Sequence, residues 1–152
     1  MKSTIFVLGS NSFSGSNYIN LLLEKKYKVI GISRGKEINP VYLKYKTSKN
    51  LKLFKFYKLD LNKNLNQIIK LIKKKKPKTI VNFIAQGMVA ESWKNPQDWY
   101  KTNIVSQVNF YNSLLKLKFI KKMIHVTTPE VFGSNIKKIK ESTNFNPNTP
   151  YS

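Results

Sequence analysis

Short apolar runs alternate with longer amphipathic stretches along the whole chain. Runs rich in Val, Ile and Phe are typical of buried strands, whereas apolar residues that recur every three or four positions predict helices. The strands predicted in this way cover residues 4–8, 28–32, 51–59, 79–84 and 122–126. The predicted helices cover residues 13–25, 65–72 and 97–117.

Strands that alternate with helices predict β-α-β crossovers, which place parallel strands in one sheet covered by helices on both faces. No internal repeat or long linker interrupts the alternation, so we expect a single α/β domain with a doubly wound parallel sheet over residues 1–152. Ligands of such sheets bind outside the carboxyl ends of the strands. One crevice should therefore be lined by the residues that follow Leu8, Ile32, Leu59, Ile84 and Val126.

Apolar spacing also predicts which side of a helix packs against the sheet. In the first helix, the apolar face consists of Tyr18, Ile19, Leu22 and Leu23. In the long helix, the apolar candidates are Trp99, Val105, Val108, Phe110, Leu114 and Leu115. Four lysines at residues 73–76 end the second helix, where cations suit the helix dipole, and Pro77 closes it.

The net charge of +21 raises nucleic acid as a partner, but the kind of charge argues against it. Of the 28 basic residues, only Arg34 is an arginine, the residue whose planar fork suits base and phosphate recognition. The lysines are spread along the chain. We therefore expect a solvated basic surface and no nucleic-acid partner, and keep a nucleic-acid binder as the weaker alternative.

Cysteine is absent and His125 is the one histidine, which excludes disulfides, thiolate metal sites and multi-histidine metal sites. The apolar run before Gly9 is too short for the core of a signal peptide. No stretch approaches the roughly 20 apolar residues that span a bilayer. We therefore expect a cytoplasmic protein with no metal and no membrane partner.

A glycine-rich turn at residues 9–15 (GSNSFSG) directly follows the first predicted strand and opens the first helix. Gly9 suits a tight turn, and Gly15 suits close packing of the helix on the strand. This geometry places backbone N–H groups and the helix dipole against a pyrophosphate. An ordinary polar loop has a similar composition, but the strand–turn–helix context favours a dinucleotide site.

The end of the second strand bears on which dinucleotide is bound. Many NAD-binding proteins place an acid here, on the ribose 2′-hydroxyl. This chain has Ser33 followed by Arg34, and a guanidinium suits a 2′-phosphate because it forms charge-assisted, bidentate bonds. NADP is therefore favoured over NAD, although Arg34 could also face solvent.

Four further segments carry a resemblance to a known family: residues 82–89 (NFIAQGMV), 99–103 (WYKTN), 125–133 (HVTTPEVFG) and 146–152 (NPNTPYS). With the glycine-rich turn, they resemble the extended short-chain dehydrogenases/reductases, in the NAD-dependent epimerase/dehydratase branch that includes the nucleotide-sugar 4,6-dehydratases. The resemblance covers residues 1–152. It implies a Rossmann-type sheet, an NAD(P) cofactor and a nucleoside-diphosphate sugar as substrate.

The same resemblance implies roles for individual residues. Thr128 would hydrogen-bond the reacting 4-hydroxyl of the sugar, Glu130 would remove the C5 proton, and Tyr151 would be the catalytic tyrosine. The implied cofactor-binding residues are Gly9, Ser12, Phe13, Ser14, Gly15, Ser33, Arg34, Asp60, Leu61, Phe83, Ile84, Ala85, Gln86 and Asn103. The implied substrate-binding residues are Gly87, Met88 and Ser92.

Three further positions bear on the proton transfers, the adenine contact and the core. Pro129 stands where some members of the family have an aspartic acid, so Glu130 would act as both base and acid. Asp60 would either contact the adenine or cap the following turn. His125 lies inside the last predicted strand, and we expect it to be a packed, hydrogen-bonded core histidine rather than a base.

The resemblance favours 4,6-dehydration of a nucleoside-diphosphate hexose through a 4-keto intermediate. A 4-epimerase or a decarboxylase on the same scaffold remains open, as does a non-catalytic NADP-binding fragment. In the family a lysine follows the tyrosine by four residues, whereas this chain ends at Ser152. We therefore expect the chain to stop before the C-terminal substrate domain and to be inactive alone. A homodimer of the complete enzyme is a further expectation.

Overall fold

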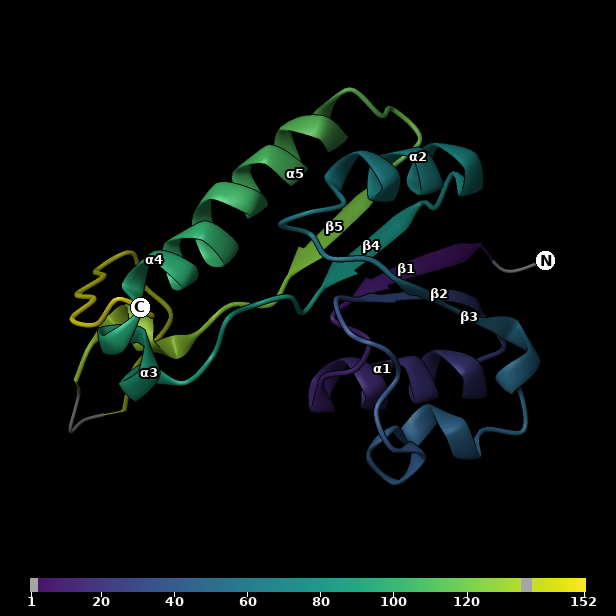
Figure 1. Cartoon of the computed structure of the whole chain (residues 1–152), viewed down its shortest axis with the longest axis horizontal. Helices are drawn as coiled ribbons and strands as arrows, with labels where there is room; N and C mark the ends of the chain where they lie inside the picture. Colours follow the sequence, from purple (N-terminus) through teal and green to yellow (C-terminus); the bar gives the residue numbers. More distant parts are fainter. Residues whose placement is uncertain (1–2, 135–137) are drawn as a thin grey trace.

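A parallel sheet forms the centre of the computed structural model, which describes residues 3–134 and 138–152 (Figure 1). Its strands are β1 (Thr4–Leu8), β2 (Lys28–Ser33), β3 (Phe54–Lys58), β4 (Thr79–Asn82) and β5 (Lys122–His125). The strand order is β3-β2-β1-β4-β5, and every neighbouring pair is parallel. The predicted Rossmann-type, doubly wound sheet is confirmed.

Helices cover both faces of this sheet (Figure 1). On one face lies α1 (Phe13–Glu24), and on the other lie α2 (Leu65–Lys75) and α5 (Ser106–Leu115). Two short helices, α3 (Val89–Lys94) and α4 (Pro96–Trp99), precede α5, and a π-helical segment (Tyr100–Val105) joins α4 to α5. Short 3₁₀ turns occur at Pro40–Tyr42, Lys44–Thr47, Leu51–Leu53 and Pro129–Phe132.

Two apolar cores result from the alternation of side chains along the strands. In β1, Ile5 and Val7 face α1, whereas Phe6 and Leu8 face α2 and α5. The α1 core also contains Ile19, Leu22, Leu23, Val29, Leu43, Tyr45 and Val81. The opposite core also contains Ile30, Ile32, Leu61, Ile68, Ile72, Ile80, Phe110 and Leu114.

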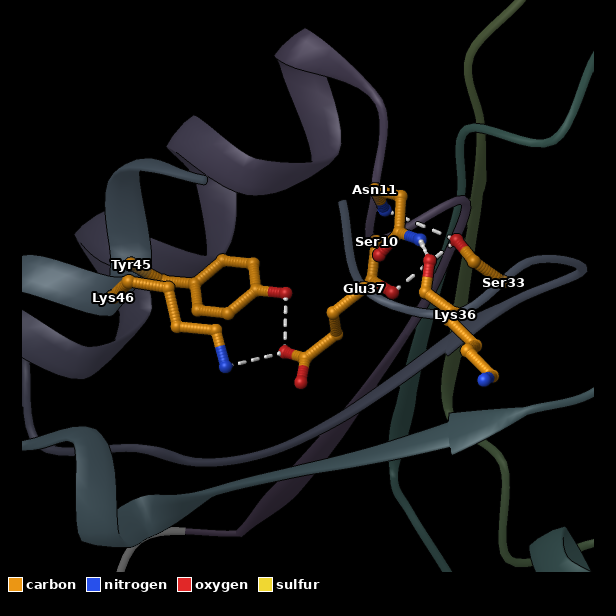
Figure 2. Close-up of polar contacts among 7 residues, drawn as sticks. All are labelled: Ser10, Asn11, Ser33, Lys36, Glu37, Tyr45 and Lys46. Atoms are coloured by element: carbon orange, nitrogen blue, oxygen red, sulfur yellow. Dashed lines mark hydrogen bonds and ion pairs between the residues drawn. The ribbon is translucent and has the colours of Figure 1, made fainter. Parts of the chain in front are cut away.

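The segment between β2 and β3 packs over α1, a feature that apolar spacing did not predict. Tyr45 is fully buried, and its ring lies 4.4 Å from that of Phe54 between centroids. Its hydroxyl donates to the Glu37 carboxylate at 2.8 Å, and Lys46 pairs with the same carboxylate at 2.9 Å (Figure 2). Burial, reinforced by Glu37, raises the pKa of Tyr45 above its ordinary value, which keeps the hydroxyl a donor. Because a 3₁₀ turn at Leu51–Leu53 completes this packing, β3 begins later than the predicted strand.

The long predicted helix is present, but its packing face is narrower than expected. Phe110 and Leu114 are buried as predicted, and so is Trp99. The prediction was wrong for Val105, Val108 and Leu115, which are exposed. Only one stripe of a helix can face a sheet, and these residues lie outside the stripe that contains Phe110 and Leu114. Within residues 3–134 and 138–152, no helix has the length and apolar character needed to cross a bilayer.

The turn between β1 and α1 depends on two glycines. Gly9 has a φ of +78°, and a Cβ atom there would lie 2.8 Å from the carbonyl carbon of Phe83, just after β4. A Cβ atom at Gly15 would overlap the carbonyl oxygen of Gly9. Both contacts are with backbone, which cannot move aside as a flexible side chain can. The turn therefore requires glycine at both positions, as the sequence predicts.

Replacing Gly15 with alanine tests this close packing. We expect Gly15→Ala to lower the free energy of unfolding by about 1–3 kcal/mol, the usual cost of overpacking. Gly35→Ala is the matched control, because a Cβ atom at Gly35 would have no other atom within 4 Å. Urea unfolding of both variants gives the measurement. Equal stability of the two variants would contradict the account of the turn.

Candidate functional site

Two adjoining cavities lie at the carboxyl edge of the sheet, with volumes of about 360 Å³ and about 650 Å³. They share Ser12, Phe83, Ile84 and Ala85, so they form one continuous crevice. The residues that follow β2 and β3 line the smaller cavity, those that follow β5 line the larger, and those that follow β1 and β4 line both. The crevice that the strand pattern predicts is confirmed.

Ser12 closes the glycine-rich turn. Its hydroxyl donates to the carbonyl of Gly9 at 2.8 Å and accepts the N–H of Gly15 at 3.0 Å, which caps α1. The hydroxyl is thus used within the turn. No acidic residue occupies the first turn of α1, so the positive end of the helix dipole is available to an anion. Ser14 lines the larger cavity, whereas the Phe13 side chain is 83% exposed and lines neither.

Ser33, the last residue of β2, ties the glycine-rich turn to the loop that follows β2. Its hydroxyl accepts the N–H of Asn11 at 3.0 Å and lies 3.3 Å from the hydroxyl of Ser10 (Figure 2). The Asn11 amide donates to the carbonyl of Lys36 at 2.7 Å. These bonds fix the wall of the smaller cavity that Ser33, Asn11 and Lys36 line.

Arg34 reaches across the smaller cavity. Its Nη1 atom donates to Oε1 of Gln86 at 3.3 Å, which joins the loop after β2 to the loop after β4. Both residues line the cavity, and Lys36 is a second cation in the lining. An anionic group in this cavity would therefore meet a guanidinium whose present partner is a neutral amide.

Of the two roles that the sequence left open for Asp60, the structure shows the turn cap, and contact with an adenine stays a prediction. Its carboxylate accepts the N–H of Asn62 at 2.8 Å, and its carbonyl accepts the N–H of Asn64 at 2.7 Å, so it caps the turn before α2. It also lines the smaller cavity. Leu61 beside it is 3% exposed and supplies an apolar part of the same wall.

Side chains from α5, its preceding π-helical segment and β4 hold the wall that the two cavities share. The Asn103 amide pairs with both backbone groups of Gln86, accepting at 2.7 Å and donating at 3.0 Å. Gln107 donates to the carbonyl of Ile84 at 3.0 Å, and Asn82 accepts the N–H of Ile84 at 2.9 Å. The sequence resemblance pointed to Asn103 but not to Gln107. Their spacing of four residues, which places both on one helix face, is the signal that could have revealed it.

The larger cavity brings together two of the three candidate catalytic residues. Thr128 and Tyr151 both line it, and so does Asn103. Glu130 lies outside the lining, in the 3₁₀ turn Pro129–Phe132, and is partly buried. The Thr128 hydroxyl accepts the backbone N–H of Glu130 at 3.1 Å, so Thr128 caps this turn.

The three residues expected to bind substrate line neither cavity. Gly87 has open space around it, and the Met88 side chain is 73% exposed. Ser92 is buried, and its hydroxyl donates to the carbonyl of Val89 at 2.6 Å. Their assignment to the substrate stays a prediction.

His125 differs from the expected core histidine. It is exposed and lines the larger cavity, although it is hydrogen-bonded as predicted. Its Nδ1 atom lies 2.5 Å from the Tyr111 hydroxyl, and the two rings meet edge to face. His125 is the last residue of β5, at the carboxyl edge of the sheet where the larger cavity lies. Partial burial against α5 lowers the pKa of His125 below its ordinary value.

Comparison with known proteins places this geometry in context. CapI of Staphylococcus aureus is 29% identical over 136 residues, which cover 88% of this chain and 40% of CapI. The UDP-Glc/GlcNAc 4-epimerase of Campylobacter jejuni matches with a TM-score of 0.84 and 23% identity, over 98% of this chain and 44% of that chain. DesIV, the dTDP-glucose 4,6-dehydratase of Streptomyces venezuelae solved with NAD and TYD bound, matches with a TM-score of 0.83 and 22% identity, over 97% of this chain and 47% of that chain.

The two structural matches show a shared fold, and the chain spans less than half the length of each of the three proteins. The family model described as GDP-mannose 4,6 dehydratase matches residues 6–152, nearly the whole chain. The chain therefore belongs to this family of extended short-chain dehydrogenases/reductases, which includes nucleotide-sugar epimerases and dehydratases.

Proposed function

We propose that the chain binds NADP across the two cavities and carries catalytic residues for 4,6-dehydration of a nucleoside-diphosphate hexose. The observation that carries this proposal is the position of the glycine-rich turn. Ser12 of that turn lines both cavities, with Arg34 in the smaller one and Thr128 and Tyr151 in the larger one. DesIV, a relative of the same fold, was solved with NAD bound.

The residues present fit a dinucleotide. The close backbone packing at Gly9 and Gly15 holds the turn at the carboxyl edge of the sheet, and the start of α1 has no acid that would repel a pyrophosphate. Arg34 and Lys36 would hold a 2′-phosphate in the smaller cavity, where Leu61 supplies an apolar wall. The nicotinamide would supply hydride transfer to and from the sugar.

The residues of the larger cavity would handle the protons of the reaction. Tyr151 would accept the proton of the 4-hydroxyl, and Thr128 would hydrogen-bond the same oxygen. Glu130, one short turn from Thr128, would remove the C5 proton and return it to the departing hydroxyl as water leaves. Because Pro129 has no acidic group, a single carboxylate would serve both steps. This assignment follows the family resemblance.

A 4-epimerase is the second candidate, and one observation favours it. Glu130 lies outside the lining of the larger cavity, whereas Thr128 and Tyr151 are inside, and epimerisation at C4 needs no base at C5. The structural match to the Campylobacter jejuni 4-epimerase is consistent with this reading. A chain that binds NADP without catalysis is the third candidate.

Product analysis separates the three candidates. A protein that carries this chain is incubated with NADP⁺ and a nucleoside-diphosphate hexose, and the products are analysed by mass spectrometry and proton NMR. We expect loss of one water from the hexose and a new keto group. A product of unchanged mass and inverted C4 would indicate an epimerase. Cofactor binding without any product would indicate the non-catalytic alternative.

The cofactor preference rests on Arg34. We expect titration calorimetry to show tighter binding of NADP⁺ than of NAD⁺. Arg34→Ala should weaken NADP⁺ binding by about 10- to 100-fold, the range for charge-assisted hydrogen bonds, with little effect on NAD⁺. Lys75→Ala, at the end of α2, removes a charge outside both cavities and serves as the control. An equal loss for both cofactors in Arg34→Ala would contradict the preference.

We also propose that a second copy of the protein covers the exposed side of α5. Val108 is 50% exposed and Leu115 is 81% exposed, and their spacing of seven residues places both on one stripe of α5. Exposed apolar stripes of this kind mark interaction surfaces.

We expect Val108→Lys to weaken self-association in sedimentation experiments. Asn109→Lys adds the same charge one residue along, outside the stripe, and should leave self-association unchanged. Equal behaviour of both variants would contradict the interface.

A further inference from the structure

A polar network beneath the shared wall of the cavities ends at His125. Asn82 at the end of β4 and Gln107 in α5 are buried and hydrogen-bonded to each other. Asn82 also donates to Tyr111 of α5, and Tyr111 is hydrogen-bonded to His125 of β5. Asn82 and His125 are also direct neighbours in the sheet register. The network therefore connects the wall formed by Ile84 to the imidazole in the larger cavity.

The backbone of Ile84 fixes the orientation of both amides. Its N–H can only donate, so the atom of Asn82 at 2.9 Å is the oxygen Oδ1. Its carbonyl can only accept, so the atom of Gln107 at 3.0 Å is the nitrogen Nε2. The Asn82 nitrogen must then donate to Oε1 of Gln107, at 2.7 Å, and to the hydroxyl of Tyr111, at 3.0 Å.

This orientation determines where the proton on the imidazole lies. The Tyr111 hydroxyl accepts from Asn82, and Nδ1 of His125, at 2.5 Å, is the other side-chain partner that the described residues offer to its proton. The Asn82 nitrogen lies 3.4 Å from Nδ1, but its two protons are used by Gln107 and Tyr111. An acceptor at Nδ1 satisfies the Tyr111 donor, and this arrangement places the proton of the neutral imidazole on Nε2.

We propose that His125 is a ligand-binding residue, held as the neutral Nε2–H tautomer, that donates a hydrogen bond to an oxygen atom in the larger cavity. This inference rests on the proposed function, which places the nicotinamide and the sugar there. In the described part of the chain, the hydrogen bonds of His125 to other side chains use Nδ1, and the residue lines the cavity. The acceptor is an uncharged oxygen, on either the cofactor carboxamide or the sugar.

The surroundings of the imidazole favour the neutral form. The polar groups nearest Nδ1 are Asn82 from β4 and Tyr111 from α5, and neither is charged at neutral pH. Gln107, the other member of the network, is neutral as well. Protonation would place a proton on Nδ1, against a Tyr111 hydroxyl that already donates there. Burial of the imidazole acts in the same direction by lowering its pKa.

The chain has one histidine, so ¹⁵N NMR of the imidazole tests the tautomer without overlap. We expect the Nε2–H pattern in the ligand-free chain at neutral pH, persisting down to pH 6.5, the ordinary pKa of histidine. Tyr111→Phe removes the donor and should give a mixture of tautomers, whereas Tyr42→Phe, in the loop after β2, should change nothing. A mixture or an Nδ1–H pattern in the unmodified chain would overturn the proposal.

Ligand addition then tests the donor role and identifies the acceptor. NADP⁺ alone and NADP⁺ with a nucleoside-diphosphate hexose form the two arms, and binding is followed by calorimetry. A shift of the Nε2–H signal with NADP⁺ alone assigns the acceptor to the cofactor, and a shift only in the second arm assigns it to the sugar. Binding without a shift in either arm would overturn the donor role. Absence of NADP⁺ binding would instead contradict both the proposed function and the donor role. The tautomer result would not be affected, because it is measured without ligand.

Substitution of His125 gives a second readout. His125→Gln keeps an N–H donor at a position similar to Nε2, whereas His125→Phe keeps the ring volume and removes the donor. We expect His125→Phe to weaken binding of the identified ligand by about five- to tenfold, the usual effect of one hydrogen bond, and His125→Gln to restore it. Thermal unfolding without ligand reports any purely structural effect. Equal affinities for both variants and the unmodified chain would contradict the donor role.

Discussion

The approach of Gly9 to the backbone of Phe83 brings together the two chain segments on which the site depends. At this point β1 turns into α1 on one face of the sheet, whereas β4 leads toward α5 on the other face. The crevice between such diverging connections is where doubly wound sheets bind ligands. The turn lies so close to neighbouring backbone that Gly9 and Gly15 have no space for a Cβ atom, and glycine at both positions permits this packing. Both cavities meet at this turn, because Ser12 and Phe83 line each of them.

Strand and helix positions could be predicted from the sequence because they depend on local periodicity. The strands β1, β2, β4 and β5 lie within or next to the predicted ranges, and α1 ends within one residue of its prediction. The predictions that were wrong or missing concern packing between segments that are distant in the sequence. The packing of Tyr45 on Phe54 over α1 involves a segment without regular periodicity. Val105 and Leu115 are apolar but exposed, and no periodicity distinguishes a residue that packs on the sheet from one on an open stripe.

The candidate site was predictable where a motif has a fixed structural context. Each predicted motif contributes residues to the lining of the crevice. These are residues of the turn at 9–15, the pair Ser33 and Arg34, and the pair Thr128 and Tyr151. Contacts between distant residues could not be predicted, as the bond from Arg34 to Gln86 and the network from Asn82 to His125 show. The sequence placed His125 in a strand, but it did not reveal that the residue lines the larger cavity. That the lysine-rich surface is merely solvated stays a prediction.

A crystal structure of the chain with NADP⁺ tests the central claim most directly. The account predicts the pyrophosphate against the turn at residues 9–15, the 2′-phosphate beside Arg34 in the smaller cavity, and the nicotinamide in the larger cavity near Thr128 and Tyr151. It also predicts that the shared wall, held by Asn103 and Gln107, keeps its position on binding. A dinucleotide bound in the reverse direction, or outside the two cavities, would contradict the account.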